Sequence, residues 1–474
     1  MKLVTALVSA VATLALIVAL PVSAHAAVPD GTIDSTFGSS GVATITATES
    51  DAIRGIAVQD DGKIITSGYY STPGWSDGWN YYAARFNVDG TLDASFGTSG
   101  IVDLDIGVGH DVPRGMAVQN DGKILIGGDI EYQSGADYRV AIVRLNTDGS
   151  LDTSFGSAGI WIDPRGDRTT FGALAVADSG ELLVSGRYTD FSNSWIMRLD
   201  SDGSTDTSFG TGGATNISGV DSRAESMAID TTGRIVVGGN DAGDFKVWRF
   251  LTTGSLDTSF GASGSTTVTV GTGEANGRKL ILSGAGIFLF GDGRLASTGN
   301  HAFTALKLTS DGSLDSSFGT AGATQATSDS AYENVALDAV QSSDGNFYLF
   351  GYQNTAGVTS GRVAALTVDG NIVSSFGTNG FATGFNGYYE VGAMQADGQI
   401  LAAGGYAVDG SHQGFGIQRF STLEYQEFLA EAESEAGSGS ELANTGAGSP
   451  LWAASAALVA LLGVGLVLAR SRKA

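Results

Sequence analysis

Pairs of aspartates four residues apart recur along this chain, and carboxylates repeated in this way could hold a hard cation. The pairs are Asp30/Asp34, Asp89/Asp93, Asp148/Asp152, Asp202/Asp206 and Asp311/Asp315. Ca²⁺ needs several oxygen ligands, and the calcium candidates Asp89, Asp93, Asp148 and Asp152 lack a complete ligand loop. The alternative is structural, with the first Asp forming an Asx-turn and the second accepting backbone N–H bonds. We expect this structural role and no bound metal or cofactor.

A second set of residues suited to recognition is aromatic. Exposed Trp and Tyr side chains suit contacts with glycans or proteins. We define the aromatic patch as Tyr69, Tyr70, Trp75, Trp79, Phe385, Tyr388 and Tyr389. Tyr81 and Tyr82 follow the first four but are expected to face the core. The two halves of the patch lie far apart in sequence and would become neighbours if the repeats close into a ring.

Signals of catalysis are few. Beyond the first 26 residues the chain has three histidines, His110, His301 and His412, and shows no Ser/His/Asp order, phosphate loop or metal-ligand spacing. The chain has no cysteine, which excludes disulfides and thiol chemistry. Carboxylates are plentiful, so a glycan-acting hydrolase or lyase stays open as the alternative to non-catalytic binding.

The aspartate pairs belong to a phrase, Asp-x-Ser-Phe-Gly-x-x-Gly or a near copy, that occurs seven times. Its phenylalanines are Phe37, Phe96, Phe155, Phe209, Phe260, Phe318 and Phe376, spaced by 59, 59, 54, 51, 58 and 58 residues. A near-constant period means that each unit is one supersecondary element that buries its apolar face against its neighbours.

One unit, residues 97–156, shows the expected content of each repeat. We predict short strands at 100–105, 116–118, 123–128 and 138–145, with Asn120-Asp121-Gly122 as a hairpin turn. Four-stranded units of this length, repeated radially, indicate an all-β fold, a seven-bladed β-propeller of four-stranded antiparallel blades over residues 30–420. The spare connector at Asp30–Gly38 is predicted to fill the gap after the last blade and close the ring.

The predicted topology separates two faces of the disc. The regular Asp-Gly turns and Phe-Gly connectors share one face, and the variable loops share the other, where recognition usually occurs. A basic residue precedes six of the connectors. These are Arg85, Arg144, Arg198, Arg249, Lys307 and Arg419. Such regular repetition favours an ion pair or a packed aliphatic stem between blades over a ligand site.

The chain resembles the delta-60 repeat family over roughly residues 30–420. The residues that carry this resemblance are the connector Asp-Gly-x-Leu-Asp-x-Ser-Phe-Gly-x-x-Gly and the turn Gln-x-Asp-Gly-Lys-Ile, present at Gln59–Ile64 and Gln119–Ile124. The resemblance implies a propeller-like fold and no particular activity.

The N-terminus has the features of a secretory signal peptide at residues 1–26. Lys2 is followed by an apolar run, and Ala24-His25-Ala26 is a small-x-small cleavage site. An uncleaved N-terminal anchor is the alternative.

The C-terminus carries a second apolar run at 451–469, long enough for a transmembrane helix and followed by basic residues. With Leu442-Ala443-Asn444-Thr445-Gly446 before it, the segment 442–474 resembles a sortase sorting signal, in which Ala443 replaces the commoner proline. The resemblance implies cleavage between Thr445 and Gly446 and attachment to peptidoglycan, with sortase as partner. A plain membrane anchor is the alternative. Residues 421–441 are predicted to form an acidic linker.

The charge balance limits the possible partners. The chain has 25 basic and 50 acidic residues, a net charge of −25. Removing the signal peptide and the segment after Thr445 takes away four basic residues, which leaves about −29. Such a surface repels nucleic acid. We therefore expect an exported, monomeric protein at the surface of a Gram-positive-like cell, acting as a binding or adhesion scaffold for an unknown glycan or protein ligand.

Overall fold

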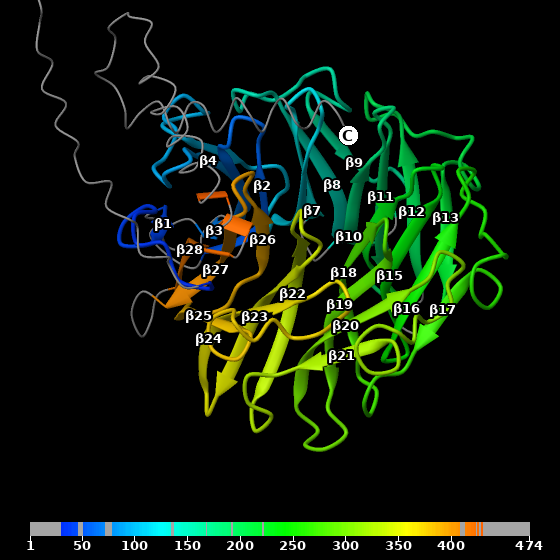
Figure 1. Ribbon diagram of the computed structural model, residues 1–474. Coiled ribbons are helices and arrows are strands. Elements are labelled where there is room, and N and C mark those ends of the chain that lie inside the picture. The colour runs from blue at the N-terminus through cyan, green and yellow to red at the C-terminus, as the bar shows by residue number, and fades with distance from the viewer. Residues whose placement is uncertain are drawn as a thin grey trace, which may run out of the picture.

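The computed structural model describes residues 30–45, 51–71, 78–133, 137–166, 168–190, 193–219, 222–407, 413–422, 424–425 and 428–429. Within these ranges the chain forms 28 β-strands. They are arranged in seven four-stranded antiparallel sheets around a central axis (Figure 1). The predicted all-β, seven-bladed propeller is confirmed.

The first four blades follow one another along the chain. Blade 1 contains β2 (Asp51–Val58), β3 (Ile64–Ser71), β4 (Trp79–Phe86) and β5 (Ile101–Leu104). Blade 2 contains β6 (Val112–Val118), β7 (Ile124–Gln133), β8 (Asp137–Leu145) and β9 (Ile160–Ile162). Blade 3 contains β10 (Thr169–Val176), β11 (Leu182–Tyr188), β12 (Asn193–Leu199) and β13 (Ala214–Ser218). Blade 4 contains β14 (Arg223–Ile229), β15 (Ile235–Asp241), β16 (Asp244–Phe250) and β17 (Ser265–Val268).

The remaining three blades complete the ring, and the last takes one strand from the N-terminus. Blade 5 contains β18 (Asn276–Ser283), β19 (Gly286–Arg294), β20 (His301–Leu308) and β21 (Ala323–Ala326). Blade 6 contains β22 (Glu333–Gln341), β23 (Phe347–Thr355), β24 (Val358–Leu366) and β25 (Phe381–Asn386). Blade 7 contains β26 (Val391–Met394), β27 (Ile400–Ala407), β28 (Gln413–Phe420) and β1 (Val42–Thr44).

The blade is offset from the repeat by one strand, which corrects the predicted grouping. The strand predicted at 100–105 was expected to open the unit that continues with 116–118. It is β5, and it pairs with β4 as the outermost strand of the preceding blade. The reason is that hydrogen bonds hold the connector before β5 against the end of β4. The Arg85 N–H donates to the carbonyl of Gly100, and the Asp93 N–H donates to the carbonyl of Arg85, so the chain returns beside β4.

Ring closure by the N-terminal segment is confirmed. β1 pairs antiparallel with β28, with Val42 opposite Gln418 and Thr44 opposite Gly416. The Gly31 N–H donates to the carbonyl of Ser421 over 2.9 Å. The first described residues therefore supply the outer strand of the last blade, which joins the two ends of the ring without a covalent link.

The core lies between neighbouring sheets rather than within one. Seven clusters of buried side chains each combine residues of two adjacent blades, and each contains one connector phenylalanine, fully buried. The seven repeats of Phe-Gly therefore correspond to seven inter-blade contacts. Burial of a Phe side chain stabilises such a contact by roughly 1.5–3 kcal/mol.

Glycine follows the first connector aspartate because of the close approach between blades. Gly149 has a φ of +90°, and an added Cβ there would lie 3.0 Å from the Phe96 ring of the preceding blade. Beside this contact, the Gly97 N–H donates to the carbonyl of Asp148 over 2.9 Å. The positive φ and the contact both exclude a larger residue.

The two ends of the sequence lie outside the described residues. This holds for the predicted signal peptide at 1–26, the sorting signal at 442–474 and its apolar run at 451–469. Among the residues that the structure does describe, no helix is both long and apolar enough to cross a bilayer. Thr422, just after β28, is buried, and its hydroxyl donates to the carbonyl of Gly398.

Candidate functional site

The connector aspartates make the hydrogen bonds expected of turn and cap residues. Asp148 Oδ1 accepts from the backbone N–H and the hydroxyl of Ser150, at 2.9 and 2.7 Å. Asp152 Oδ1 accepts from the same two groups of Ser154, at 3.1 and 2.6 Å, and its Oδ2 accepts from Arg144 Nε at 2.8 Å. Asp89 and Asp93 make equivalent contacts in blade 1. The bonds to Ser154 and the nearby cations hold the pKa of Asp152 well below its usual range, against the opposing effect of burial.

These carboxylates are therefore occupied by protein donors. In the part of the chain that the structure describes, no three His, Asp or Glu side chains are arranged as a group that could hold a metal ion. The calcium candidates Asp89, Asp93, Asp148 and Asp152 have the geometry of turn residues.

The basic residue before the connector makes its ion pair within its own blade, which corrects the predicted ion pair between blades; the arginines reach the neighbouring blade through a hydrogen bond to a backbone carbonyl, and Lys307 pairs with Asp315 of its own blade. Arg85 Nε donates to Asp93 Oδ2 at 2.7 Å within blade 1, and its Nη1 donates to the carbonyl of Thr147 in blade 2 at 2.6 Å. Its guanidinium lies 4.8 Å from the centroid of the Phe96 ring. Matching contacts are made by Arg144, Arg198, Arg249 and Arg419. The connector face is thus stabilised by ion pairs within the blades and by hydrogen bonds from arginine to the next blade.

The first half of the aromatic patch lies at the ends of β3 and β4, on the opposite face. The Tyr69 and Trp79 rings stack with centroids 4.9 Å apart, and Trp79 also lies 4.7 Å from the ring of His110. Tyr70 packs 6.5 Å from Tyr82, which is buried in the core as predicted, like Tyr81. Tyr69, Tyr70 and Trp79 are half-buried. Trp75 lies outside the described residues.

The second half of the patch is divided between surface and core. Tyr389 is fully buried, and its hydroxyl donates to Gln418, so it packs inside the ring rather than facing a ligand. Phe385 lies 4.9 Å from Tyr389 and is half-buried. Tyr388 is also half-buried, and its ring lies 6.5 Å from that of Tyr352.

Ring closure brings the two halves together at one arginine. The guanidinium of Arg54, on β2, lies 5.7 Å from the centroid of Tyr69, and both Tyr69 and Tyr388 act electrostatically on it. Arg54 Nη1 pairs with Glu390, which precedes β26 of blade 7. The patch therefore adjoins the central axis at the seam between the first and last blades.

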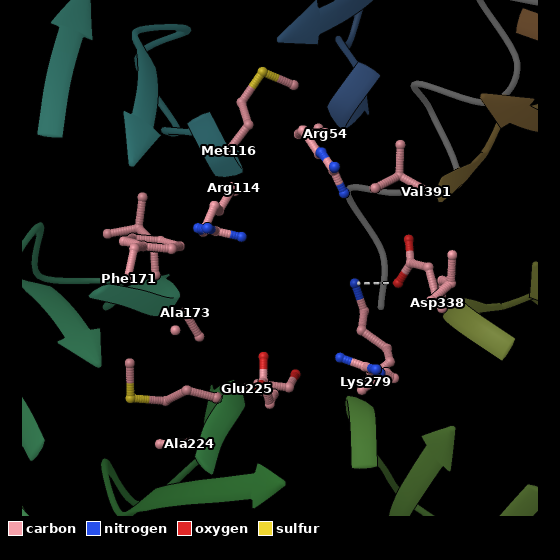
Figure 2. A pocket seen from close by; sticks show the side chains of 18 of the residues that line it. Arg54, Arg114, Met116, Phe171, Ala173, Ala224, Glu225, Lys279, Asp338 and Val391 are labelled. Atoms are coloured by element: carbon pink, nitrogen blue, oxygen red, sulfur yellow. Dashed lines mark ion pairs between the residues drawn. The ribbon is translucent and has the colours of Figure 1, made fainter. Parts of the chain in front are cut away.

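An axial cavity of about 610 Å³ lies at this point, lined by the innermost strands of all seven blades. Its charged lining residues are Arg54, Arg114, Arg187, Arg223, Glu225, Arg278, Lys279, Asp338 and Glu390. Its apolar lining residues, from the same strands, include Ile56, Met116, Leu174, Met227, Leu280 and Val391. Figure 2 shows Arg54, Arg114, Glu225 and Lys279 pointing into the cavity from four different blades.

Four of the charged residues, Arg54, Arg114, Glu225 and Arg278, lie where the innermost strands are irregular. In six of them the pairing with the next strand shifts register, for example between Ile53 and Gly55 and between Pro113 and Gly115. An extra residue at such a shift is left unpaired and its side chain is redirected. Arg54, Arg114 and Arg278 occupy these extra positions.

Most carboxylates in the cavity are held by cations. Lys279 Nζ lies 3.0 Å from Asp338 Oδ1, and Asp338 Oδ2 accepts the N–H of Gly392 at 2.9 Å (Figure 2). Glu390 is paired with Arg54. The side chain of Arg114 is held in place by a hydrogen bond, since its Nε donates to the buried Asp129 at 2.5 Å. This arrangement fixes several guanidinium and ammonium groups around one space.

A second hollow, of about 380 Å³, lies between blades 5 and 6. It contains the buried Asp292, whose Oδ2 lies 2.6 Å from His301 Nδ1, and this hydrogen bond raises the pKa of His301. Arg278 lines both this hollow and the axial cavity. Sequence analysis did not identify this pair, because Asp292 and His301 come from different strands and match no motif.

Comparison with protein families gives one match, described as "Domain of unknown function (DUF5122) beta-propeller". It covers residues 59–96, 119–155, 178–209 and 231–260, each running from the turn before the second strand to the connector phenylalanine of blades 1–4. A search of curated proteins found no match.

A search of solved structures found several matches of low sequence identity. A protein of unknown function from Dyadobacter fermentans is 12% identical, covers 81% of this chain and 98% of its own, and gives a TM-score of 0.44. A protein from Lactobacillus plantarum is 15% identical, with coverages of 76% and 96% and a TM-score of 0.46. Regucalcin from Agrobacterium tumefaciens, titled a calcium-binding protein, is 9% identical, with coverages of 80% and 94% and a TM-score of 0.37.

Proposed function

We propose that this chain is an exported binding propeller, displayed at the surface of a Gram-positive-like cell, that recognises a ligand without chemical conversion. In this proposal it is a delta-60 repeat protein. The observation that carries the binding role is the axial cavity, where fixed charged side chains of several blades converge beside Tyr69 and Tyr388. A closed ring presents such a site with little reorganisation, which favours binding.

The state of the cavity carboxylates favours binding over glycoside hydrolysis. A hydrolase of the usual kind needs one carboxyl group to act as acid and a second to act as nucleophile or base. Here Asp338 is engaged by Lys279 and by a backbone N–H, and Glu390 is engaged by Arg54. A carboxylate held by such contacts is not free to act as acid, base or nucleophile. The glycan-acting enzyme is kept as an outcome of the test below.

Display at the surface rests on the two chain ends. The proposal includes removal of residues 1–26, a transient membrane helix at 451–469, and transfer by sortase to peptidoglycan after cleavage between Thr445 and Gly446. The acidic segment 421–441 would then separate the propeller from the wall. The large negative charge of the chain favours solubility at high local concentration.

Two measurements test this proposal. Thr445→Ala should move the protein from the wall fraction to the membrane or medium, while the matched change Ser440→Ala should leave it in the wall. An unchanged wall fraction for Thr445→Ala would remove sortase from the account. The full chain should also bind members of a glycan and host-protein array without altering them, whereas cleavage of an arrayed glycan would establish the enzyme instead.

A further inference from the structure

The hollow between blades 5 and 6 is lined by polar side chains from two facing sheets. Blade 5 contributes Asn276, Arg278, Asp292, Arg294 and His301, and blade 6 contributes Glu333, Val335, Tyr352 and Asn354. Strand pairing gathers them, since Arg294 lies opposite His301 in blade 5. Glu333 lies opposite Asn354 in the same way in blade 6. At this place the two sheets face each other with groups that form hydrogen bonds.

Three of these side chains are each held by one hydrogen bond and keep a second polar atom. His301 Nδ1 lies 2.6 Å from Asp292 Oδ2, which leaves Nε2. Glu333 Oε2 accepts the backbone N–H of His301 at 2.7 Å, which leaves Oε1. Asn354 Oδ1 accepts the N–H of Gly357 at 3.0 Å, which leaves Nδ2. Within the described residues no protein group bonds to these second atoms, so the side chains are fixed in place before a ligand arrives.

The equivalent position in blade 2 is closed by bonds that blade 5 lacks. Asp129 corresponds to Asp292, because each pairs with the innermost strand just before its register shift. Asp129 accepts from Arg114 Nε at 2.5 Å and from the N–H of Phe171 in blade 3 at 2.6 Å. Asp292 accepts from side chains of its own blade, and its buried Oδ1 has no hydrogen-bond partner in the described structure. The bond that joins blades 2 and 3 thus has no counterpart here among the described residues, and the hollow lies in its place.

The hollow lies on the face of the variable loops. His301 begins β20 directly after the loop 295–300. Asn300 Nδ2 donates to the carbonyl of Ser330 in the loop before β22 at 3.1 Å, which joins the two loops beside the hollow. The side chain of His301 is 15% exposed, compared with 2% for Asp292. The imidazole can therefore meet a ligand, while the carboxylate holds it from inside.

The mixture of groups in the hollow limits the ligand. Two arginines and two carboxylates line it, so with a neutral His301 the lining has no net charge. This balance favours neither an anion nor a cation. A hydroxyl group both donates and accepts hydrogen bonds, so it matches a mixed set of donors and acceptors. The volume of about 380 Å³ lies in the range of sites for small molecules.

Tyr352 adds an aromatic ring with a polar tip. Its side chain is half-buried, and its hydroxyl has no hydrogen-bond partner within the described residues. A tyrosine presents an apolar surface together with a hydroxyl, which suits the two kinds of surface of a sugar. We propose that the hollow between blades 5 and 6 binds one neutral sugar residue through its hydroxyl groups, with His301, Glu333 and Tyr352 as the contacts. This inference rests on the proposed binding function and adds a site beside the axial cavity.

The test is saturation-transfer NMR of the full chain, in a detergent without a sugar head group. The probes are the methyl glycosides of glucose, galactose, mannose and N-acetylglucosamine, and glycine and acetate are the charged comparison ligands. We expect at least one glycoside to bind with a Kd on the order of 1 mM, as befits a ligand of this size. Glycine and acetate should bind at least about 10-fold more weakly, since the balanced lining does not compensate the loss of their hydration. Binding of none of the glycosides, or equal binding of glycine or acetate, would overturn the assignment.

Two variants locate the site. His301→Gln removes Nε2 and keeps an amide that can donate to Asp292, and it should weaken glycoside binding about 10-fold. Tyr352→Phe removes only a hydroxyl and should weaken binding at least about threefold. Tyr138→Phe is the matched control, because Tyr138 occupies in blade 2 the strand position that His301 occupies in blade 5, and it should have no effect. Tyr352→Phe keeps the test decisive even where His301→Gln fails to fold.

The outcomes also separate this inference from the proposed function. A glycoside that binds equally well to the parent chain, His301→Gln and Tyr352→Phe would lie elsewhere, which would refute the assignment to the hollow and leave the binding function intact. A ligand found on the array without any bound glycoside would have the same meaning. Absence of any ligand on the array, together with no bound glycoside, would refute both.

Discussion

Phe37 provides the sharpest test of how the ring is held together. It lies in the N-terminal connector, is fully buried, and packs in a cluster that combines blade 1 with blade 7. Phe155 occupies the same position at the seam between blades 2 and 3, where the chain is continuous. The two rings have matched cations above them, Arg419 at 4.7 Å and Arg144 at 4.5 Å.

The expected magnitude follows from these contacts. Truncation of a buried Phe to Ala costs about 3–5 kcal/mol, because apolar burial is lost and a cavity is left. Loss of the contact with the arginine adds about 0.5–1 kcal/mol. If the N-terminal connector is an integral part of the ring, Phe37→Ala and Phe155→Ala should lower the free energy of unfolding by the same amount, about 4 kcal/mol.

The assay is urea denaturation of the purified protein, followed by tryptophan fluorescence and circular dichroism. Removal of residues 27–38 should have an effect at least as large as Phe37→Ala, and it should destabilise blade 7 as well as blade 1. A loss of about 4 kcal/mol for Phe155→Ala beside less than about 1 kcal/mol for Phe37→Ala would refute the reasoning. In that event the N-terminal segment would detach without opening the ring.

Three further perturbations address the connectors. Gly149→Ala should destabilise the protein by about 1–2 kcal/mol more than Gly212→Ala. Both glycines have a positive φ, but only Gly149 lies against a phenylalanine ring of the neighbouring blade. Equal losses of unfolding free energy in urea titrations would contradict the packing argument. The pKa of Asp152 is lower in the folded chain than in the unfolded chain, so the ionised carboxylate stabilises the fold at any pH above the unfolded pKa. This stabilisation is lost as the pH falls from the unfolded pKa through the folded pKa. Asp152→Asn should therefore flatten the loss of Tm below about pH 4, and an unchanged dependence of Tm on pH would count against this role. Ca²⁺ should raise Tm no more than NaCl of equal ionic strength does, since charge screening is nonspecific. A rise in Tm that is specific to calcium and is abolished by Asp152→Ala would show that the connectors are metal sites.

The ring itself could be predicted because its determinants are local and repeated. Each connector places one phenylalanine in one inter-blade cluster, so seven phrases predict seven blades. The turns require Gly where φ is positive and Asp where a side chain accepts a hydrogen bond from the backbone. Both requirements are visible in the sequence. The blade to which β5 belongs could not be predicted from the repeat, because this strand could pair with the strand before it or with the strand after it. The hydrogen bonds that fold its connector back onto Arg85 place it beside β4.

The candidate site was predicted in part. Tyr69, Trp79 and Tyr388 were identified by their type and by the expectation that closure would join the first and last blades. Tyr389 was assigned with them because it follows Tyr388, but adjacent residues on extended chain point in opposite directions, and Tyr389 points into the core. Sequence proximity alone could not separate these two roles.

The axial cavity could not be predicted from the sequence, for a different reason. Alternation along a regular strand assigns each side chain to one face of the sheet, and the register shift at Arg54, Arg114 and Arg278 interrupts that alternation. The residues therefore carry no periodic signal of their direction. Composition was also misleading, because a net charge describes a whole surface and says nothing of where opposite charges gather. A chain with twice as many acidic as basic residues still gathers six basic side chains around its axis, because the backbone of the innermost strands and not the overall composition decides where they point.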